Sequence, residues 1–182
     1  MHPMTAANLR NAHGGESMAH MRYMIWGSRA EKEGYGNVAR LFRAIASAET
    51  VHAGNHFREL KDEAGDELCA SKAVFGLAGT SQNLQGGIDG ESFEITEMYP
   101  AYLEVAKFQD EEGAQRSFHY ALSAEKEHAA LFKKAKESVD SGRDAEVGAV
   151  RVCSVCGWTH DGDLPDTCPI CGAKRDKFWS FE

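Results

Sequence analysis

The chain has 182 residues, of which 42% are hydrophobic and 26% charged, an ordinary composition for a globular protein. Its 28 acidic and 20 basic residues give a formal net charge of −8, which argues against nucleic-acid binding, because phosphate binding relies on clustered Lys and Arg. No stretch approaches the ~20 apolar residues of a membrane span, and the first residues lack a signal-peptide pattern. We therefore expect a cytoplasmic protein with one moderate domain and a small appendage.

The N-terminal part of the chain, interrupted after Pro3 only by Pro100, has the period of long amphipathic helices. In two of the predicted helices the inward-facing stripe is apolar at first and then changes to carboxylate and imidazole. A solvated run of charges would not lie on the apolar face, so these polar side chains are predicted to be buried. The two stripes are Val38, Phe42, Ile45, Glu49, His52 and His56, and Phe118, Leu122, Glu125, His128 and Phe132.

The two stripes belong to an internal repeat. Residues 47–53 and 123–129 are identical at five of seven positions. A Gly-Glu-Ser triplet precedes each segment at a matched distance, and these triplets contain Glu16 and Glu91. The sequence therefore predicts a duplicated helix pair, in which the first helix carries a Glu and the second carries Glu-x-x-His.

This pattern indicates a metal site in the middle of a helical bundle. Glu and His at positions i and i+3 share one helical face and can reach one ion, and mixed carboxylate and imidazole donors suit iron, manganese or zinc. The alternative is a set of buried salt bridges, but few Lys or Arg lie on the same stripes, and buried carboxylates without cations would be costly. The pattern is that of ferritin-like di-iron proteins, with predicted ligands Glu16, Glu49, His52, Glu91, Glu125 and His128.

The remaining histidines and the crossover carry less information. We expect His2, His13, His20, His119 and His160 to lie at the surface or to make local hydrogen bonds, and the sequence leaves the role of His56 open.

A Gly-rich crossover is expected from about Lys61 to Gly90, with Cys69 as an inert thiol that is at least half-buried. The polar segment 138–144 breaks the helical pattern and predicts a linker, which divides the chain into domains 1–146 and 147–182.

The tail contains two Cys-x-x-Cys-Gly motifs, formed by Cys153 and Cys156 and by Cys168 and Cys171. Four thiolates close a tetrahedral site for zinc or for a single iron, and the spacing does not choose between them. Iron is favoured beside a redox-capable bundle. The Gly after each pair predicts a tight turn with positive φ. We expect the tail's aromatic residues to cover the metal site: Trp158, Phe178, Trp179 and Phe181.

In this order, the motifs resemble the rubrerythrin family over nearly the whole chain. They comprise Glu49-x-x-His52, Gly90-Glu91-Ser92-Phe93-Glu94, Met98-Tyr99-Pro100, Glu125-x-x-His128 and the paired cysteine knuckles. Glu94 is the distinguishing residue, because rubrerythrins carry this second carboxylate at i+3. The resemblance implies a mainly α, ferritin-like four-helix bundle with a long crossover, followed by a small β-rich rubredoxin-like ribbon.

The resemblance also implies a function: reduction of hydrogen peroxide to water in oxidative-stress defence. Two irons in the carboxylate site and one in the four-cysteine site are the implied cofactors, with electrons from rubredoxin or an NAD(P)H-dependent reductase. In the family, Glu94 and His52 would exchange on one iron. Subunits of the family pair head to tail, so that the tail of one approaches the di-iron site of the other, and a homodimer or higher homo-oligomer is expected. Tyr23 and Tyr99 are candidates for hydrogen bonds to ligand carboxylates. Two alternatives remain open: an O2-using ferroxidase, and a non-enzymatic zinc-ribbon interaction module.

Overall fold

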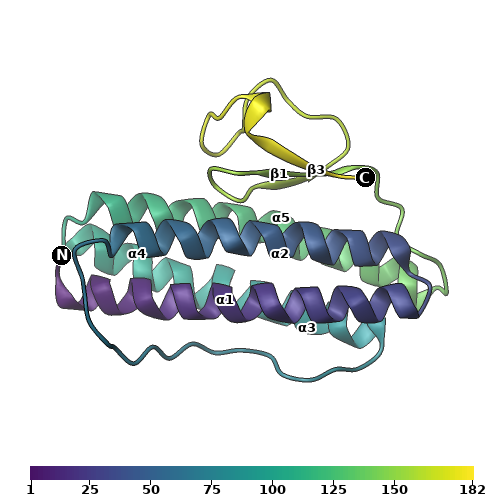
Figure 1. Ribbon diagram of the computed structural model, residues 1–182, viewed down its shortest axis with the longest axis horizontal. Helices are drawn as coiled ribbons and strands as arrows, with labels where there is room; N and C mark the ends of the chain where they lie inside the picture. Colours follow the sequence, from purple (N-terminus) through teal and green to yellow (C-terminus); the bar gives the residue numbers. More distant parts are fainter.

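The computed structural model describes all residues, 1–182, and shows a long helical bundle with a small sheet domain lying across it (Figure 1). A π-helical turn, Glu94–Met98, joins the third and fourth helices into one interrupted helix, so the structure is a four-helix bundle, as predicted. No helix has the combination of length and apolar character that crossing a membrane requires. The helices are α1 (Pro3–Lys32), α2 (Gly36–Glu59), α3 (Thr80–Phe93), α4 (Tyr99–Phe108) and α5 (Glu112–Asp140).

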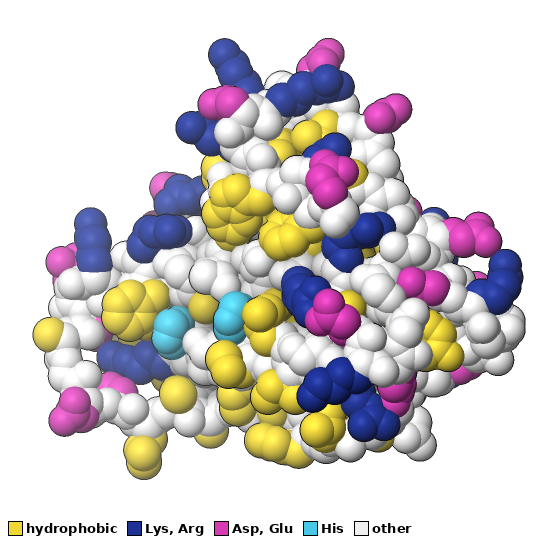
Figure 2. Space-filling view, turned by 45° about the vertical axis from the view of Figure 1, so that its right-hand side comes forward, with side chains coloured by type: hydrophobic (Ala, Val, Ile, Leu, Met, Phe, Trp, Pro, Cys, Tyr) yellow, Lys and Arg dark blue, Asp and Glu magenta, His cyan; other side chains and the backbone are white.

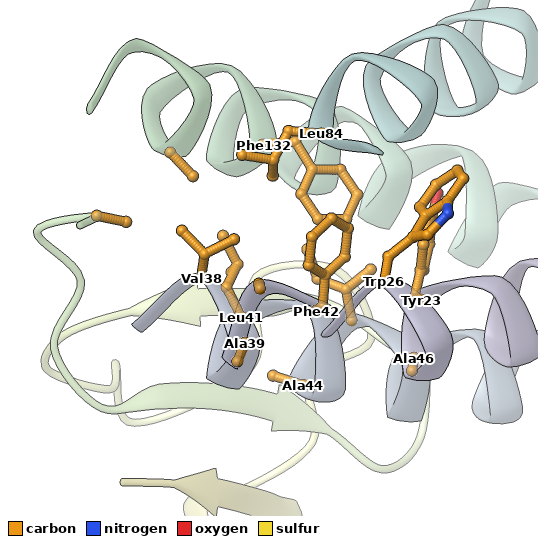
Figure 3. Packing of buried hydrophobic residues seen from close by; sticks show 14 of the residues in the cluster. Tyr23, Trp26, Val38, Ala39, Leu41, Phe42, Ala44, Ala46, Leu84 and Phe132 are labelled. Carbon is orange, nitrogen blue, oxygen red and sulfur yellow. The ribbon is translucent and has the colours of Figure 1, made fainter. Parts of the chain in front are cut away.

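Two apolar clusters fill the bundle on either side of its middle. One is built on aromatic rings from three helices, with Tyr23, Phe42 and Phe132 packed at centroid distances of 5.1–5.9 Å (Figure 3). The other contains Leu9 and Phe118 and lies toward the opposite end of α1 and α5. On α1 the buried apolar positions of the second cluster stop at residue 12 and those of the first resume at residue 19. The polar parts of the two stripes predicted from the sequence therefore lie between the two apolar clusters.

The crossover is shorter than the sequence indicated, because α3 already begins at Thr80. Gly86, Gly87 and Gly90 of the expected crossover therefore lie inside the helix, where the first two permit close packing. A Cβ on Gly86 would lie 2.9 Å from Trp26 Cη2, and one on Gly87 would lie 2.9 Å from Phe132 Cδ2. The coil before α3 runs along α1 (Figure 1). Cys69 lies on this coil and is exposed, so the expectation of a half-buried thiol is wrong.

The tail forms a three-stranded antiparallel sheet in the order β2-β1-β3, with β1 (Val150–Cys153), β2 (Thr159–Asp161) and β3 (Phe178–Phe181). Val150 and Val152 are fully buried and join the larger hydrophobic core of the bundle. The sheet is therefore anchored to the bundle of its own chain through β1, which contacts α2.

The aromatic residues of the tail divide between two roles. Trp158 and Phe178 pack with the cysteines, as expected. Phe181 instead packs against the bundle core, and Trp179 is 44% exposed, so these two do not cover the metal site. The difference follows from the strand period of two, since neighbouring side chains on β3 point to opposite faces of the sheet.

The linker follows the end of α5 at Asp140 and is held down on the bundle. Both carboxylate oxygens of Asp144 accept hydrogen bonds from the first turn of α2, at 2.8 Å from the amide of Asn37 and 3.2 Å from that of Val38. Asp144 thus caps a helix from outside it, where the unpaired amides favour an anion. We propose the boundary between the two domains at residues 146 and 147, just after this cap.

Candidate metal centres

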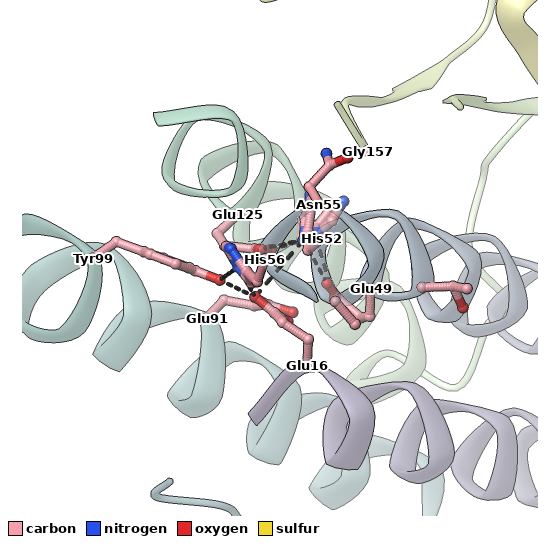
Figure 4. A network of polar contacts seen from close by, with 12 residues as sticks. Glu16, Glu49, His52, Asn55, His56, Glu91, Tyr99, Glu125 and Gly157 are labelled. Atoms are coloured by element: carbon pink, nitrogen blue, oxygen red, sulfur yellow. Dashed lines mark hydrogen bonds and ion pairs between the residues drawn. The ribbon is translucent and has the colours of Figure 1, made fainter. Parts of the chain in front are cut away.

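The predicted carboxylates and histidines converge in the middle of the bundle (Figure 4). Each helical layer contributes: α1 one carboxylate, α3 one carboxylate, and α2 and α5 each a Glu-x-x-His pair. Their side chains are at most 1% exposed, so the whole cluster is removed from solvent. The members are Glu16, Glu49, His52, Glu91, Glu125 and His128.

Two overlapping groups of ligand atoms form within this cluster, each with its members within 4.8 Å of one another. One group contains Glu16 and His52, the other Glu91 and His128, and both contain Glu49 and Glu125. Nδ1 of His52 lies 2.7 Å from Glu125 and 2.9 Å from Glu49. Nδ1 of His128 lies 2.6 Å from Glu125 and 3.5 Å from Glu49. Two carboxylates shared between two half-sites is the arrangement that two neighbouring cations require.

The electrostatics of the cluster show that positive charge is missing. Burial, and then repulsion from neighbouring carboxylates, raise the pKa values of Glu16, Glu91 and Glu94 well above the usual range. Burial alone would lower the pKa of His128, but the Glu125 and Glu49 carboxylates together outweigh it and raise the pKa to about 9. In the same way Glu125 and Glu49 raise the pKa of His52 despite its burial.

The residues fit a pair of cations. No Lys or Arg forms a salt bridge with any carboxylate of the cluster, and the buried atoms Glu16 Oε2 and Glu49 Oε1 have no hydrogen-bond partner. Such atoms are costly when left unpaired, and oxygen and imidazole donors suit first-row metals such as iron. The orphaned oxygens are thus accounted for as metal ligands.

Glu94 lies outside both groups, at the first position of the π-helical turn. It is 8% exposed, more than the six clustered residues, and its charge is felt by Glu16 and His52. Pro100 follows this turn and has no amide hydrogen for a regular α-helical bond, which favours a local change of pitch. π-Helical turns are frequent at functional sites, and no periodicity in the sequence indicated this one.

Two tyrosines and one histidine support the carboxylates from outside. Tyr23 donates a hydrogen bond of 2.5 Å to Glu91, and Tyr99 donates one to Glu16, so both tyrosine predictions fit the geometry. His56, whose role the sequence left open, is fully buried and bonds to Tyr99 and to Ser117. Burial lowers the pKa of His56 to about 3, so this imidazole is neutral.

The four cysteines of the tail form a second candidate metal centre. Sγ of Cys153 lies 3.6 Å from Cys171, and Sγ of Cys156 lies 3.5 Å from Cys168. Tetrahedral metal–sulfur bonds of ~2.3 Å would separate the sulfurs by about 3.8 Å, so one ion fits. The glycines after each pair have φ of +79° and +73°, as predicted. A hydrogen bond from Cys156 lowers the pKa of the Cys153 thiol to about 5.

The tail lies directly on the carboxylate cluster of its own chain. Nε2 of His52 donates to the carbonyl of Cys156 at 3.1 Å, and Asn55 Nδ2 donates to the carbonyl of Val155 at 2.9 Å. Nε2 of His128 bonds to Thr159 Oγ1 at 2.9 Å, and that hydroxyl donates to Gly157. Because Nε2 carries the hydrogen in both rings, Nδ1 is left as the metal-binding nitrogen. No motif or periodicity in the sequence indicated the roles of Asn55 and Thr159.

Comparison with known proteins agrees with these two centres. The profile of the family described as Rubrerythrin matches residues 7–136, and that of its rubredoxin-like domain matches residues 152–179. The chain belongs to the rubrerythrin family. Rubrerythrin-2 of Clostridium acetobutylicum is 53% identical over 98% of this chain and 97% of its own length. Nigerythrin of Nitratidesulfovibrio vulgaris is 33% identical over 97% of this chain and 86% of its own length.

Solved structures show the same architecture. Nigerythrin in its fully reduced, all-ferrous state matches with a TM-score of 0.86 at 30% identity, covering 97% of this chain and 86% of that one. Rubrerythrins are oxidoreductases, and this member carries the residues of their di-iron site and of their rubredoxin-like site. It is therefore a di-iron redox protein, and its rubredoxin-like domain implies a redox partner.

Proposed function

We propose that this rubrerythrin reduces hydrogen peroxide to water in the cytoplasm, as a defence against oxidative stress. The overall reaction consumes two electrons and two protons for each peroxide and yields two waters. An NAD(P)H-linked donor, either a reductase or a rubredoxin, would supply the electrons. When iron is bound, the paired site holds both electrons and the four-thiolate site supplies them one at a time.

One observation carries this proposal: the cysteine loop of the tail is hydrogen-bonded to a histidine of the carboxylate cluster. The Cys156 carbonyl belongs to a thiolate residue, and its partner His52 turns Nδ1 toward Glu49 and Glu125. A four-cysteine site has no open position for substrate. A fused site of this kind, placed one hydrogen bond from the cluster, supports reductive turnover better than iron storage.

The chain's own residues would hold and adjust the cluster. We assign as ligands Glu16, Glu49, His52, Glu91, Glu125 and His128. Glu94 would exchange with His52 at the cation position of the group that contains Glu16. The structure has His52 inside the first group and Glu94 outside it, on a turn of altered pitch, which supports such an exchange. Tyr23 and Tyr99 would orient ligand carboxylates through their hydroxyl hydrogens, which burial and neighbouring carboxylates hold in place by raising both pKa values.

Anaerobic stopped-flow spectroscopy tests the proposal. The chemically reduced protein is mixed separately with peroxide and with O2-saturated buffer, and the visible absorption of the thiolate-bound iron is followed. Fast return of the colour with peroxide and slow return with O2 is the expected result. Comparable or faster reoxidation by O2 would favour the alternative ferroxidase function, and a colourless oxidised protein would mean that the tail holds zinc.

Two variants separate the roles of the two centres. Cys171→Ser is expected to leave peroxide binding at the di-iron site and to abolish turnover driven by an external donor. Retained turnover would contradict the role of the tail. Glu94→Ala should slow peroxide reduction much more than it lowers iron content, and the opposite pattern would make Glu94 a purely structural ligand.

A further inference from the structure

A buried reaction centre needs a path by which substrate reaches it. The cluster ligands are at most 1% exposed, and the tail covers them on the side of His52 and His128. The seam between α1 and α2 offers another side. On the exterior of the bundle, histidine side chains lie at the surface among hydrophobic ones (Figure 2).

A hollow of about 480 Å³ lies in this seam, and Glu49 is one of the residues that line it. Glu49 is also a member of both metal-binding groups, and its Oε1 has no hydrogen-bond partner. The hollow therefore leads from the exposed side chain of Phe57 at its rim to a ligand of both cations.

Two other hollows are poorer candidates. The one beside Trp26, about 380 Å³, is lined by no member of the cluster. The one between Asn55 and Arg116 measures only about 70 Å³ and includes Ser117, whose hydroxyl is already bonded to His56.

Two histidines of α1 flank the larger hollow. His13 and His20 are seven residues apart and share one helical face, with Glu16 between them on the same stripe. Nδ1 of His13 lies 3.1 Å from the carbonyl of Ala53, and Nδ1 of His20 lies 2.8 Å from that of Ala46. A carbonyl only accepts, so each Nδ1 carries the hydrogen.

The second nitrogen of each ring is left free. In a neutral imidazole with hydrogen on Nδ1, Nε2 is an acceptor, and no protein group bonds to Nε2 of His13 or His20. Both rings are partly buried in the wall of the hollow. Hydrogen peroxide, which has an O–H donor at each end, can donate to either acceptor. His13 and His20 lie ~10 Å apart along α1, so the two rings offer successive acceptors along the wall of the hollow.

Resting on the proposed peroxidase function, we propose that the hollow between α1 and α2 is the route by which peroxide reaches the di-iron site. His13 and His20 are the positioning residues, each of which accepts one hydrogen bond from peroxide through Nε2 at successive points of this route. Neither residue is among the predicted metal ligands. The sequence predicted for them only a surface position or local hydrogen bonds, whereas this proposal assigns them the capture of substrate.

Gly54 provides a steric test of the route. A Cβ at this position would meet only the Arg58 side chain, at 3.5 Å, so Gly54→Phe can place its ring in the hollow. Azide binding to the iron-loaded, oxidised protein is followed through its visible charge-transfer band, which reports access independently of peroxidase activity. The second-order rate constants for azide and for peroxide should both fall about tenfold or more, because overpacking must be relieved before either ligand passes. Thr50→Trp repeats the test from the rim if Gly54→Phe does not load iron.

Substitutions of the histidines test the second half of the proposal. Asn can place an amide N–H where Nδ1 donates, but it has no group at the Nε2 position, whereas Gln can replace Nε2. His13→Asn and His20→Asn should slow the reaction with limiting peroxide about threefold to tenfold, the worth of one hydrogen bond. The azide rate, measured with an anion that has no hydrogen to donate, should stay unchanged. Gln at either position should restore part of the peroxide rate.

The outcomes separate the two proposals. An unchanged azide rate in Gly54→Phe and Thr50→Trp, at full iron content, would overturn the route. A fall in the azide rate only in Arg116→Trp, which fills the smaller hollow beside Asn55, would overturn it too. Equal loss of azide and peroxide rates in the Asn variants would overturn the hydrogen-bonding role. Blocked azide binding in a protein that does not reduce peroxide would retain the route and reject the peroxidase function.

Discussion

Gly157→Ala tests whether the tail functions in the position where the structure places it. Gly157 follows the first cysteine pair with φ of +79°, and a Cβ there would lie 2.1 Å from His52 Nε2. Gly172 is its counterpart after the second pair, with φ of +73° and nothing within 4 Å of the added atom. Alanine at either position costs about 1–2 kcal/mol for the left-handed backbone, so the two variants share the strain and differ only in the clash.

The size of the clash predicts how far the tail must move. A carbon atom needs about 3.4 Å or more from a neighbouring heavy atom, so the added Cβ must retreat by about 1.3 Å. A shift of this size lengthens the bond from His52 Nε2 to the Cys156 carbonyl, now 3.1 Å, beyond hydrogen-bonding range. Gly157→Ala should thus lose this hydrogen bond in addition to the backbone strain that both variants share. Its free energy of unfolding should therefore be about 1 kcal/mol lower than that of Gly172→Ala.

The assay measures both consequences. Chemical denaturation at matched iron content gives the free energies of unfolding. Stopped-flow mixing of the reduced protein with peroxide gives the rate at which the tail iron regains its colour, which should fall in Gly157→Ala and not in Gly172→Ala. Equal rates in the two variants would refute the reasoning. The tail would then serve the di-iron site from another position, as it would if it docked on a partner subunit.

Three further predictions concern other parts of the chain. Gly87→Ala should lower the free energy of unfolding by about 1–3 kcal/mol because the added Cβ overlaps Phe132. Gly36→Ala is the control, since a Cβ there has no neighbour within 4 Å. Denaturant titration compares the two variants. Cys69 should react with iodoacetamide in the native, iron-loaded protein while the four tail cysteines stay protected, and Cys69→Ser should abolish this labelling. Burial holds the pKa of His56 at about 3, so the unfolded chain binds a proton that the folded chain does not as pH falls below about 6.5. Stability should therefore decline from pH 7 to pH 5, and His56→Asn should decline less; equal slopes would contradict a neutral buried imidazole.

The sequence predicts which side chains meet in the middle of the bundle because the motifs are repeated. Two Glu-x-x-His pairs and two Gly-Glu-Ser triplets at matched distances have one simple explanation, and the structure brings those six side chains together. The glycine conformations could be predicted from the paired knuckles because each tight turn needs a positive φ, which Gly157 and Gly172 adopt without a Cβ clash.

What the sequence could not predict depends on contacts between distant segments. The glycines of residues 86 and 87 looked like crossover coil, yet they are needed because Trp26 and Phe132 approach them. The exposure of Cys69 depends on how the coil lies along α1. The hydrogen bonds of Asn55 and Thr159 depend on where the tail settles on the bundle. None of these produces a period or a motif.

The duplicated halves are nearly equivalent in sequence, and the structure shows where that equivalence ends. The position that matches Glu94 in the first half is Ala19, which is buried in the hydrophobic core. The extra carboxylate thus exists in one half of the repeat only, and its charge acts on Glu16 and His52 as well as on Glu91. The tail is asymmetric in the same sense, because His52 meets the backbone of a cysteine ligand, whereas His128 meets a hydroxyl. These two departures from symmetry support the proposal that the cation position of His52 changes its ligands while the position of His128 keeps them.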